Sequence, residues 1–431
     1  MLEKKTILSL EQALALPYAT QRFVQLGWRV IRIESPAEGD ENAGDPNRYI
    51  GANLGFHDLH SYYIAPNVGK EAITINLKKK EGQELLKKII RELRVDVFMC
   101  NTLPKRYKQL GIDFETLREA NPNLIWCGIS AMGPAHPERA GYDPALQALL
   151  GYTFLTGEPS GKPVPCGIPI IDLKAGEEAF TQVLLAMLEQ KYLSPTPPPK
   201  DREEISELKK VPDNKVFPYV EDLEEPGKEI HISMAQCAAS WLITALPQLN
   251  FVKSDDELFQ RSGNEHRSFI PCNAYPTKDG FIYLAIGNDS QWAKFTSLER
   301  FESLAKPMRK TNEGRMKDKE NIYKEIGTLT KNYTTKEFYD LCISLNLSVA
   351  PVNSIKEVAA LEYVCNAMVK TKLPDGKEAK LSPPSHHTDF LIKNNFQVEG
   401  APRLGEHNDA VYKSCGVTEE EMVILKEKKI I

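Results

Sequence analysis

The chain has 431 residues, more than a single hydrophobic core of ordinary size contains, so we expect two domains. Hydrophobic residues make up 42% of the chain, charged residues 26%, and the formal net charge is −5. These values describe a soluble globular protein with no reason to bind nucleic acid or a membrane surface, although the basic run Lys78–Lys80 suits a small polyanion. The N-terminus lacks the apolar core of a signal peptide, and no apolar run approaches the ~18 residues of a membrane span.

Strands and helices alternate through the first part of the chain. Apolar or alternating runs predict strands over 6–10, 29–34, 72–77, 95–101 and 124–130, and helices over 17–27 and 79–93. This alternation predicts an α/β domain with a Rossmann-like parallel sheet over residues 1–193. Ligands of such sheets bind beyond the carboxyl ends of the strands, where Asn101, Ser130 and Asp172 are expected to lie.

A helix is expected from Asp172 to Leu193. Its apolar residues recur every four positions in two adjacent rows, Ala175, Ala179, Val183 and Met187 beside Phe180, Leu184 and Leu188, which predicts a broad buried face. Asp172 then stands where a loop enters the helix. Two interpretations fit this position: an N-cap residue, or a nucleophilic carboxylate kept ionised by the positive end of the helix dipole.

The second half of the chain changes character at residue 194. Residues 194–250 are interpreted as a charged, proline-rich insertion or linker followed by a helix. A smaller α+β domain is expected over 251–352, with a β-hairpin formed by 273–275 and 281–286 around an Asp-Gly turn. Residues 353–431 are loop-rich and are expected to return to the large domain.

The sequence lacks several common catalytic and cofactor motifs. No GxGxxG follows a strand, and GxxxxGK[ST], GxSxG and HExxH do not occur, so a nucleotide-phosphate loop is not indicated. The eight cysteines are scattered without a CxxC pair or nearby histidines, which predicts no resident metal and a reducing, cytoplasmic location.

A series of short segments resembles the class III CoA-transferases, the family of formyl-CoA, carnitine and benzylsuccinate CoA-transferases. The matching segments are Pro17–Thr20, Val30–Glu34, Asn67–Lys70, Ile73–Leu77, Asn101–Gly111, Asn121–Ile125, Gly141–Asp143, Leu155–Pro159, Gly263-Asn264, Asp279-Gly280 and Ala401–His407. Each is weak alone, but they stand in the family's order over nearly the whole chain. The chain departs from the family pattern at Leu16, usually Gly, at Ser35, often Arg, and at Thr102, commonly aromatic.

The resemblance implies covalent catalysis by Asp172, at the position of the family's nucleophile. Asp172 would receive the acyl group of a donor acyl-CoA and then carry CoA as an aspartyl-CoA thioester, with CoA thioester as a substrate and without ATP or metal. Family positions that bind CoA correspond to Leu14, Ala15, Leu77, Asn101 and Thr102, and those that flank the substrate correspond to Tyr142 and Asp143. For Ala15 and Leu77, ordinary packing is an equally good interpretation.

Substrates, assembly and two rival functions remain open at this level. Similarity to the benzylsuccinate branch suggests succinyl-CoA as donor and a dicarboxylic or aryl-substituted acid as acceptor. The resemblance also implies an interlocked homodimer, or a heteromer with a paralogous subunit. One rival is a 2-methylacyl-CoA racemase, which needs a His where this chain has Tyr142, a poor base at neutral pH. The other is a non-catalytic partner subunit of a heteromeric transferase.

Overall fold

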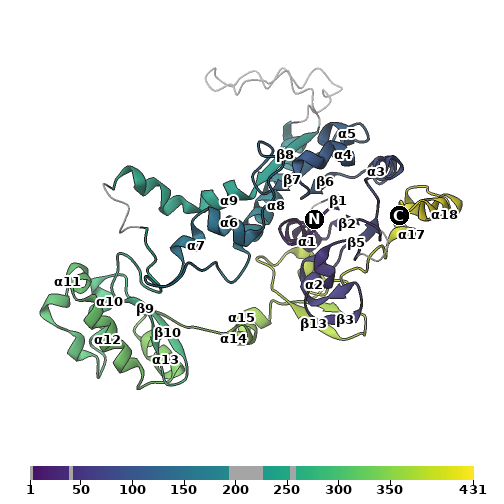
Figure 1. Ribbon diagram of the computed structural model, residues 1–431. Helices are drawn as coiled ribbons and strands as arrows, with labels where there is room; N and C mark the ends of the chain where they lie inside the picture. Colours follow the sequence, from purple (N-terminus) through teal and green to yellow (C-terminus); the bar gives the residue numbers. More distant parts are fainter. Residues whose placement is uncertain (1–2, 38–41, 194–226, 253–258) are drawn as a thin grey trace, which may run out of the picture. The chain divides into compact units, whose positions relative to one another are not determined.

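The computed structural model describes residues 3–37, 42–193, 227–252 and 259–431. The chain divides into two compact units, and Figure 1 shows their elements. The first unit comprises Met1–Leu146, Ile168–Leu242 and Ala367–Ile431, and the second comprises Gln147–Gly167 and Ile243–Asn366. The division differs from the expected boundaries because residues 147–167 belong with the second unit, as do residues 243–250 and 353–366. Most of the expected insertion, residues 194–226, lies outside the described residues.

The first unit is built on a parallel sheet of six strands with the order β5-β2-β1-β6-β7-β8. Its strands are β1 (Thr6–Leu10), β2 (Arg29–Glu34), β5 (Glu71–Thr74), β6 (Val97–Cys100), β7 (Ile125–Ser130) and β8 (Lys228–Ser233). Counted within this sheet, the order is 3-2-1-4-5-6, so the Rossmann-like prediction is confirmed. The connections change direction between β1 and β6, which places a ligand crevice at the carboxyl ends of these two strands.

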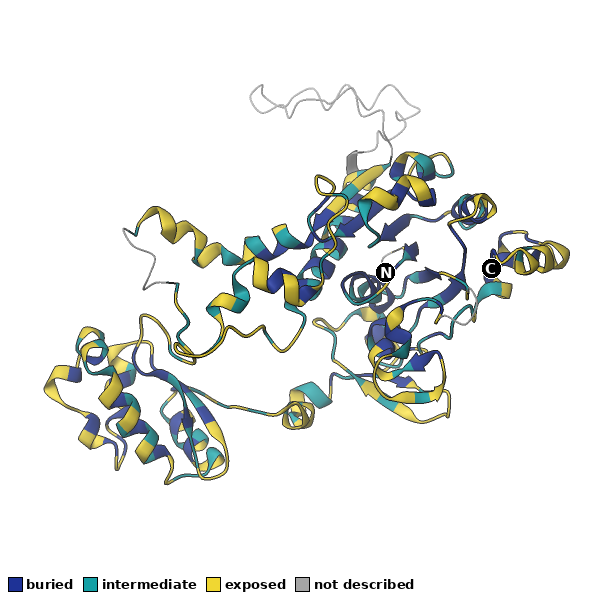
Figure 2. Ribbon diagram, in the orientation of Figure 1, coloured by how far each residue is buried: buried dark blue, intermediate teal, exposed yellow. Residues whose placement is uncertain are grey.

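Helices cover both faces of this sheet because the strand side chains alternate between two apolar layers. Leu8, Ile31 and Phe98 point to one layer, where they pack with α3 (Lys80–Glu92), α5 (Phe114–Arg118) and α17 (Asn408–Ser414). On the other face, α1 (Ala15–Gln25) and α8 (Ile170–Leu193) pack against the strands. In Figure 2 the central strands are accordingly buried along most of their length.

Close packing of α1 against α8 depends on small side chains. Gly176 lies so near α1 that a Cβ atom added there would stand 2.6 Å from the Ala15 carbonyl oxygen. In the first predicted row, Ala175, Ala179 and Val183 are fully buried, whereas Met187 is half-buried. The second row is wrong in part, since Leu188 is 51% exposed. The buried face of α8 is therefore narrower than the sequence pattern indicated.

The remaining elements pack around the sheet or adjoin it. They are η1 (Pro46–Tyr49), β3 (Asn53–Phe56), β4 (Leu59–His60), α2 (Ser61–Asn67), η2 (Pro104–Arg106), α4 (Tyr107–Leu110), α6 (Asp143–Leu149), α9 (Met234–Trp241), β12 (Val369–Lys372), β13 (Glu378–Leu381), α16 (Asp389–Lys393) and α18 (Glu419–Glu427). The C-terminal segment joins this unit through α17, where the Asn408 side chain accepts from the Thr74 N–H at 2.8 Å. No helix of the described residues is both long and apolar enough to cross a membrane.

The second unit is a smaller α+β body. An antiparallel sheet of β9 (Cys272–Pro276), β10 (Phe281–Ala285) and β11 (Ser348–Pro351) packs on α10 (Asp289–Phe295), α12 (Lys319–Thr330) and α13 (Thr335–Ser344). The β9–β10 connection closes as the expected hairpin, with the Thr277 N–H donating to the Gly280 carbonyl at 2.9 Å. Trp292, Phe295 and Phe338 lie in its apolar core.

Candidate active site

A cavity of about 260 Å³ lies at the carboxyl ends of the central strands. The loops after β1, β6 and β7 and the first turn of α8 supply its wall. Its lining residues are Gln12, Ala13, Ala15, Asn101, Thr102, Leu103, Ile129, Ser130, Ala131, Arg139, Ala140, Gly141, Tyr142, Asp172 and Met234. Asn101, Ser130 and Asp172, which the strand pattern predicted to lie at this edge, therefore line one cavity.

Asp172 is not the N-cap residue of its helix. Helix α8 begins at Ile170, so Asp172 belongs to its first turn. The carboxylate of Asp143 instead accepts the backbone N–H groups of Ile171 and Asp172, at 2.6 and 3.0 Å from its Oδ2 atom. The N-cap interpretation is therefore wrong. Among the described residues, no group donates a hydrogen bond to the Asp172 carboxylate, which lines the cavity.

The surroundings of Asp172 disfavour its charged form. Burial removes water from its carboxyl group, and the nearby charge of Asp143 repels a second negative charge. Together these effects raise the pKa of Asp172 to about 7. The expectation that the helix start keeps this carboxylate fully ionised is wrong, because Asp143 already occupies the N–H groups that would have stabilised the charge.

The residues expected to bind CoA or substrate divide among several places. Ala15, Asn101, Thr102 and Tyr142 line the cavity together with Asp172, and Tyr142 is 79% exposed. Asp143 does not line the cavity, and its carboxylate accepts a backbone N–H group at the start of α8. The remaining two lie elsewhere: Leu77 lines an adjacent cavity, and Leu14 lines a third one beside α1.

The side chain of Asn101 is engaged with the protein backbone. Its Oδ1 atom accepts the Gln12 N–H at 3.1 Å, and its Nδ2 group donates to the Gln12 carbonyl at 2.7 Å. Asn101 therefore bridges the ends of β1 and β6 at the point where the sheet connections change direction. Any contact with a ligand is made in addition to this bridge.

The adjacent cavity, of about 210 Å³, continues along the same edge of the sheet. It shares Gln12, Asn101, Thr102 and Leu103 with the cavity of Asp172. Lys78 and Arg106, both exposed, also line it. Lys78 stands in the basic run already noted in the sequence, whereas Arg106 was missed because it lies in a short 3₁₀ helix without a recognisable motif.

Two further lining residues escaped sequence reasoning. Gln12 lines both cavities, and Arg139 is the cation among the lining residues of the Asp172 cavity. Arg139 could have been found from its position three residues before Tyr142, just outside the Gly141–Asp143 segment expected to flank the substrate. Because a guanidinium pairs readily with carboxylates, this cavity can accept an anionic group beside Asp172.

Comparisons with known proteins agree with this geometry. The model of CoA-transferase family III matches residues 2–192 and 219–408. A succinate–glutarate CoA-transferase of Agrobacterium fabrum is 27% identical over 409 residues, covering 94% of this chain and 93% of that protein. The succinyl-CoA:glutarate CoA-transferase of Homo sapiens is 26% identical, covering 96% and 85%. In fold, the chain resembles a CAIB/BAIF family protein from Brucella suis, with a TM-score of 0.76 and 24% identity, covering 95% of this chain and 98% of that one.

Proposed function

Because the chain belongs to CoA-transferase family III and is a CoA-transferase, we propose that Asp172 is its nucleophile. One observation carries this proposal. The Asp172 carboxylate lines a cavity at the crevice of the sheet without a hydrogen-bond donor among the described residues, while Asp143 satisfies the helix start. A carboxylate that is poorly solvated and not engaged by the protein is suited to attack a thioester carbonyl.

The reaction proceeds in four balanced steps. The Asp172 carboxylate attacks the thioester carbonyl of the donor acyl-CoA, and the C–S bond breaks to leave a mixed anhydride and CoA thiolate. The thiolate then attacks the Asp172 carbonyl carbon, releasing the donor acid and forming an aspartyl-CoA thioester. An acceptor carboxylate attacks this thioester to give a second mixed anhydride and CoA thiolate. Attack of the thiolate on the acceptor's carbonyl forms the new acyl-CoA and restores Asp172.

The lining residues supply positions for both substrates. Ala15, Thr102 and the exposed Tyr142 line the cavity around the reacting carboxylate. The adjacent cavity, with Leu77, Lys78 and Arg106, extends from the same wall and suits the phosphorylated part of CoA. Asp143 acts on Asp172 through the helix start and through its charge, so it is a positioning residue.

For the substrates we propose succinyl-CoA as donor and a free dicarboxylic acid as acceptor. Relatives that act on succinyl-CoA and glutarate support this choice, as does the guanidinium of Arg139 in the cavity wall. A dicarboxylic acid places one carboxylate at the reacting centre and can pair the other with Arg139. Benzylsuccinate shares this chemistry and is the second acid to be tested.

The test is to incubate the protein alone with succinyl-CoA and to quench it with hydroxylamine. We expect a hydroxamate at Asp172 in peptide mass spectrometry, and CoA transfer when glutarate or benzylsuccinate is added. Asp172→Asn should abolish both signals, whereas Glu178→Gln, a change on the same helix at a residue paired with Lys174, should retain them. Transfer that survives Asp172→Asn would overturn the proposed nucleophile. A wild-type protein without any adduct would instead favour the role of a partner subunit.

We also propose that two copies of the chain form an interlocked dimer, as the family resemblance implies. The segment after α8 leaves large apolar side chains exposed, among them Trp241, Ile243 and Phe251 at 52%, 74% and 84%. Such side chains favour burial against a partner. Light scattering of the purified protein should give twice the chain mass, and a monomer that transfers CoA would contradict the dimer.

A further inference from the structure

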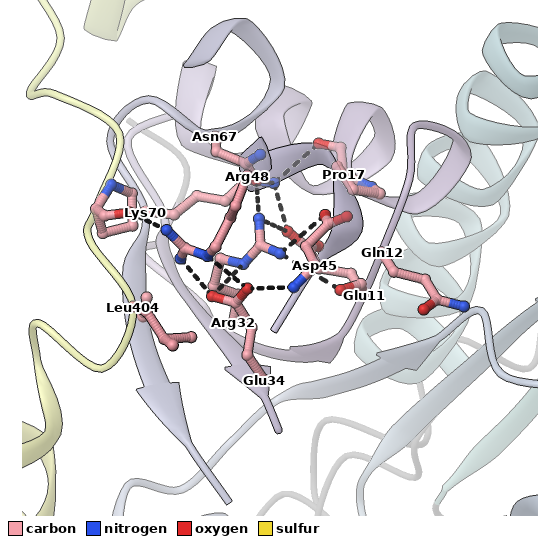
Figure 3. Close-up of polar contacts among 12 residues, drawn as sticks. Glu11, Gln12, Pro17, Arg32, Glu34, Asp45, Arg48, Asn67, Lys70 and Leu404 are labelled. Atoms are coloured by element: carbon pink, nitrogen blue, oxygen red, sulfur yellow. Dashed lines mark hydrogen bonds and ion pairs between the residues drawn. The ribbon is translucent and has the colours of Figure 1, made fainter. Parts of the chain in front are cut away.

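Charged side chains next to the loop after β1 form a buried cluster of ion pairs (Figure 3). The ion cluster consists of Glu11, Arg32, Glu34, Asp45, Arg48 and Lys70, each with a side chain at most 1% exposed. Its acidic and basic members are equal in number. Burial lowers the pKa of Lys70 to about 8. The opposite charges nevertheless hold the pKa of the two glutamates below, and that of the two arginines above, their ordinary values. Buried ion pairs of this kind rarely stabilise a fold more than apolar side chains would, so another role is expected.

Three members of the cluster, Arg32, Asp45 and Lys70, bind the short loop of residues 11–14 between β1 and α1. Arg48 instead donates to the Asp58 and Pro402 carbonyls, at 3.2 and 3.0 Å. Lys70 donates to the Glu11 carboxylate at 2.6 Å, and Arg32 Nη2 donates to the Glu11 carbonyl at 3.4 Å. Asp45, which pairs with Arg32 at 3.1 Å, accepts the Ala13 N–H at 3.2 Å. These bonds tie the start of the loop to β2 and to the segment before η1.

Neutral side chains complete the same arrangement. Asn47 donates to the Ala13 carbonyl at 2.8 Å, and Asn101 binds both backbone groups of Gln12. The backbone N–H and carbonyl groups of Gln12 and Ala13 therefore each have a side-chain partner from another segment. The loop belongs to neither helix nor sheet, and these side chains hold it in one conformation.

That conformation is a strained one. Ala13 has a φ angle of +60°, in the left-handed region that a residue with a Cβ atom rarely adopts. A strained residue persists only where its surroundings over-determine it, and such residues gather at functional sites. A glycine at position 13 would adopt the same φ without this penalty.

The loop forms part of the wall that the two cavities share. Gln12 lines both of them, and Ala13 and Ala15 line the cavity of Asp172. In Figure 3 the side chain of Gln12 extends away from the buried charges. A movement of this loop would therefore change the wall facing the nucleophile.

We propose that Asn47 and the ion cluster are positioning residues, which hold the strained Gln12–Ala13 backbone as a rigid wall of the cavity of Asp172. This inference rests on the proposed function, in which that cavity is the site of acyl transfer. The buried charges stabilise the strained backbone in a single conformation. A cavity wall with a fixed conformation keeps the thioester near Asp172.

The test uses Asn47→Ala, which removes one bond to the loop without leaving a buried charge unpaired. Four proteins are compared: wild type, Asn47→Ala, Ala13→Gly, and the double variant. Formation of the Asp172 adduct from succinyl-CoA is measured in single turnovers at several donor concentrations, together with the melting temperature. The matched control is Asn408→Ala, which removes two side-chain bonds to Thr74, and neither of these residues lines either cavity.

We expect Asn47→Ala to slow adduct formation about tenfold at saturating donor, the effect of one lost hydrogen bond on a reaction barrier. Ala13→Gly alone changes the cavity wall itself, so its rate serves as the reference against which the double variant is compared. In the double variant, glycine should restore a substantial part of the lost rate, because it populates φ +60° without strain. Asn408→Ala should lower the melting temperature but leave the rate of the folded protein unchanged.

A wild-type rate in Asn47→Ala, or a double variant as slow as Asn47→Ala, would overturn the inference. If wild-type protein forms no Asp172 adduct, the proposed function fails. The inference is then read from CoA affinity, measured by calorimetry on the same proteins. The inference predicts that Asn47→Ala binds CoA more weakly than wild type and that the double variant regains part of this affinity. Equal CoA affinities in all of these proteins would overturn the inference.

Discussion

The carboxylate of Asp143, and not that of Asp172, occupies the free N–H groups at the start of α8. This arrangement has two consequences for Asp172. Its own oxygens are left available to the cavity, and its charge is disfavoured by the second carboxylate nearby, so that its pKa rises to about 7. The proposed nucleophile therefore has a pKa close to neutral pH, where a change of pH alters its charge.

The first prediction concerns the pH dependence of acyl transfer. Only the ionised carboxylate attacks a thioester, so the rate of adduct formation should rise about tenfold per pH unit below pH 7 and level off above it. Single-turnover measurements with succinyl-CoA from about pH 5 to about pH 9 would check this profile. A rate that is constant down to about pH 5 would show that Asp172 ionises at its ordinary pKa.

The second prediction separates the two effects of Asp143. In Asp143→Asn the side-chain oxygen can still accept the helix N–H groups, but the negative charge is gone. The pKa of Asp172 should therefore fall, and the pH profile of adduct formation should shift toward acid. Asp143→Ala also removes the acceptor and should lower the free energy of unfolding by about 1 kcal/mol, as for a lost N-cap. Equal pH profiles for wild type and Asp143→Asn would exclude the proposed charge effect.

The third prediction concerns stability. When a carboxyl group has a higher pKa in the folded than in the unfolded state, the folded protein loses stability as the pH rises from the unfolded-state pKa to the folded-state pKa. For Asp172 this window runs from 3.8 to about 7, so the penalty is absent at low pH and complete above the window. Asp172→Asn removes the charge and should raise the free energy of unfolding by a few kcal/mol near pH 8, with little gain near pH 4. Urea unfolding of both proteins at the two pH values would check this difference.

Five of the six strands of the large sheet could be predicted because they are encoded locally. The sixth, β8 (Lys228–Ser233), was missed because it lies in the segment interpreted as a linker and a helix. Runs such as Arg29–Glu34 and Ile125–Ser130 carry their apolar pattern within a few residues, and the observed strands match the predicted ones within a few positions. The hairpin of β9 and β10 was likewise visible in its Asp-Gly turn. The local pattern of apolar and turn residues was sufficient to predict these strands and this hairpin.

The arrangement around Asp172 could not be predicted because its partners are distant in sequence. The group that caps α8 stands 29 residues before Asp172, and a motif search within the helix does not reveal it. The ion cluster could not be predicted for the same reason, since Lys70 lies 59 residues from Glu11. One signal was present: β2 carries Arg32 and Glu34 in the interior of a sheet covered on both faces, where charges need partners.

The fourth prediction concerns the choice of acceptor. Arg139→Ala should raise the KM for glutarate at least about tenfold, because the carboxylate away from the reacting centre loses a charge-assisted partner. Transfer to butyrate, which lacks a second carboxylate, should change little. Arg139→Lys keeps the charge but loses the planar pair of donors, so its KM for glutarate should lie between those of wild type and Arg139→Ala. If glutarate and butyrate were affected equally, Arg139 would have no part in recognising a dicarboxylic acid.

The fifth prediction concerns the cavity that adjoins the site. Lys78 and Arg106 line it at the same sheet edge, where the phosphates of CoA would lie. Lys78→Ala and Arg106→Ala should each raise the KM for succinyl-CoA about tenfold, with a smaller rise at high salt, because exposed charges are screened. A succinyl thioester of pantetheine, which lacks the nucleotide, should react equally with wild type and with both variants. Since binding energy from a remote part of a substrate can also be used in the transition state, a fall in kcat for succinyl-CoA alone would still assign these cations to the nucleotide. Equal losses with both thioesters would instead place their effect on the wall that Gln12 and Asn101 share with the cavity of Asp172.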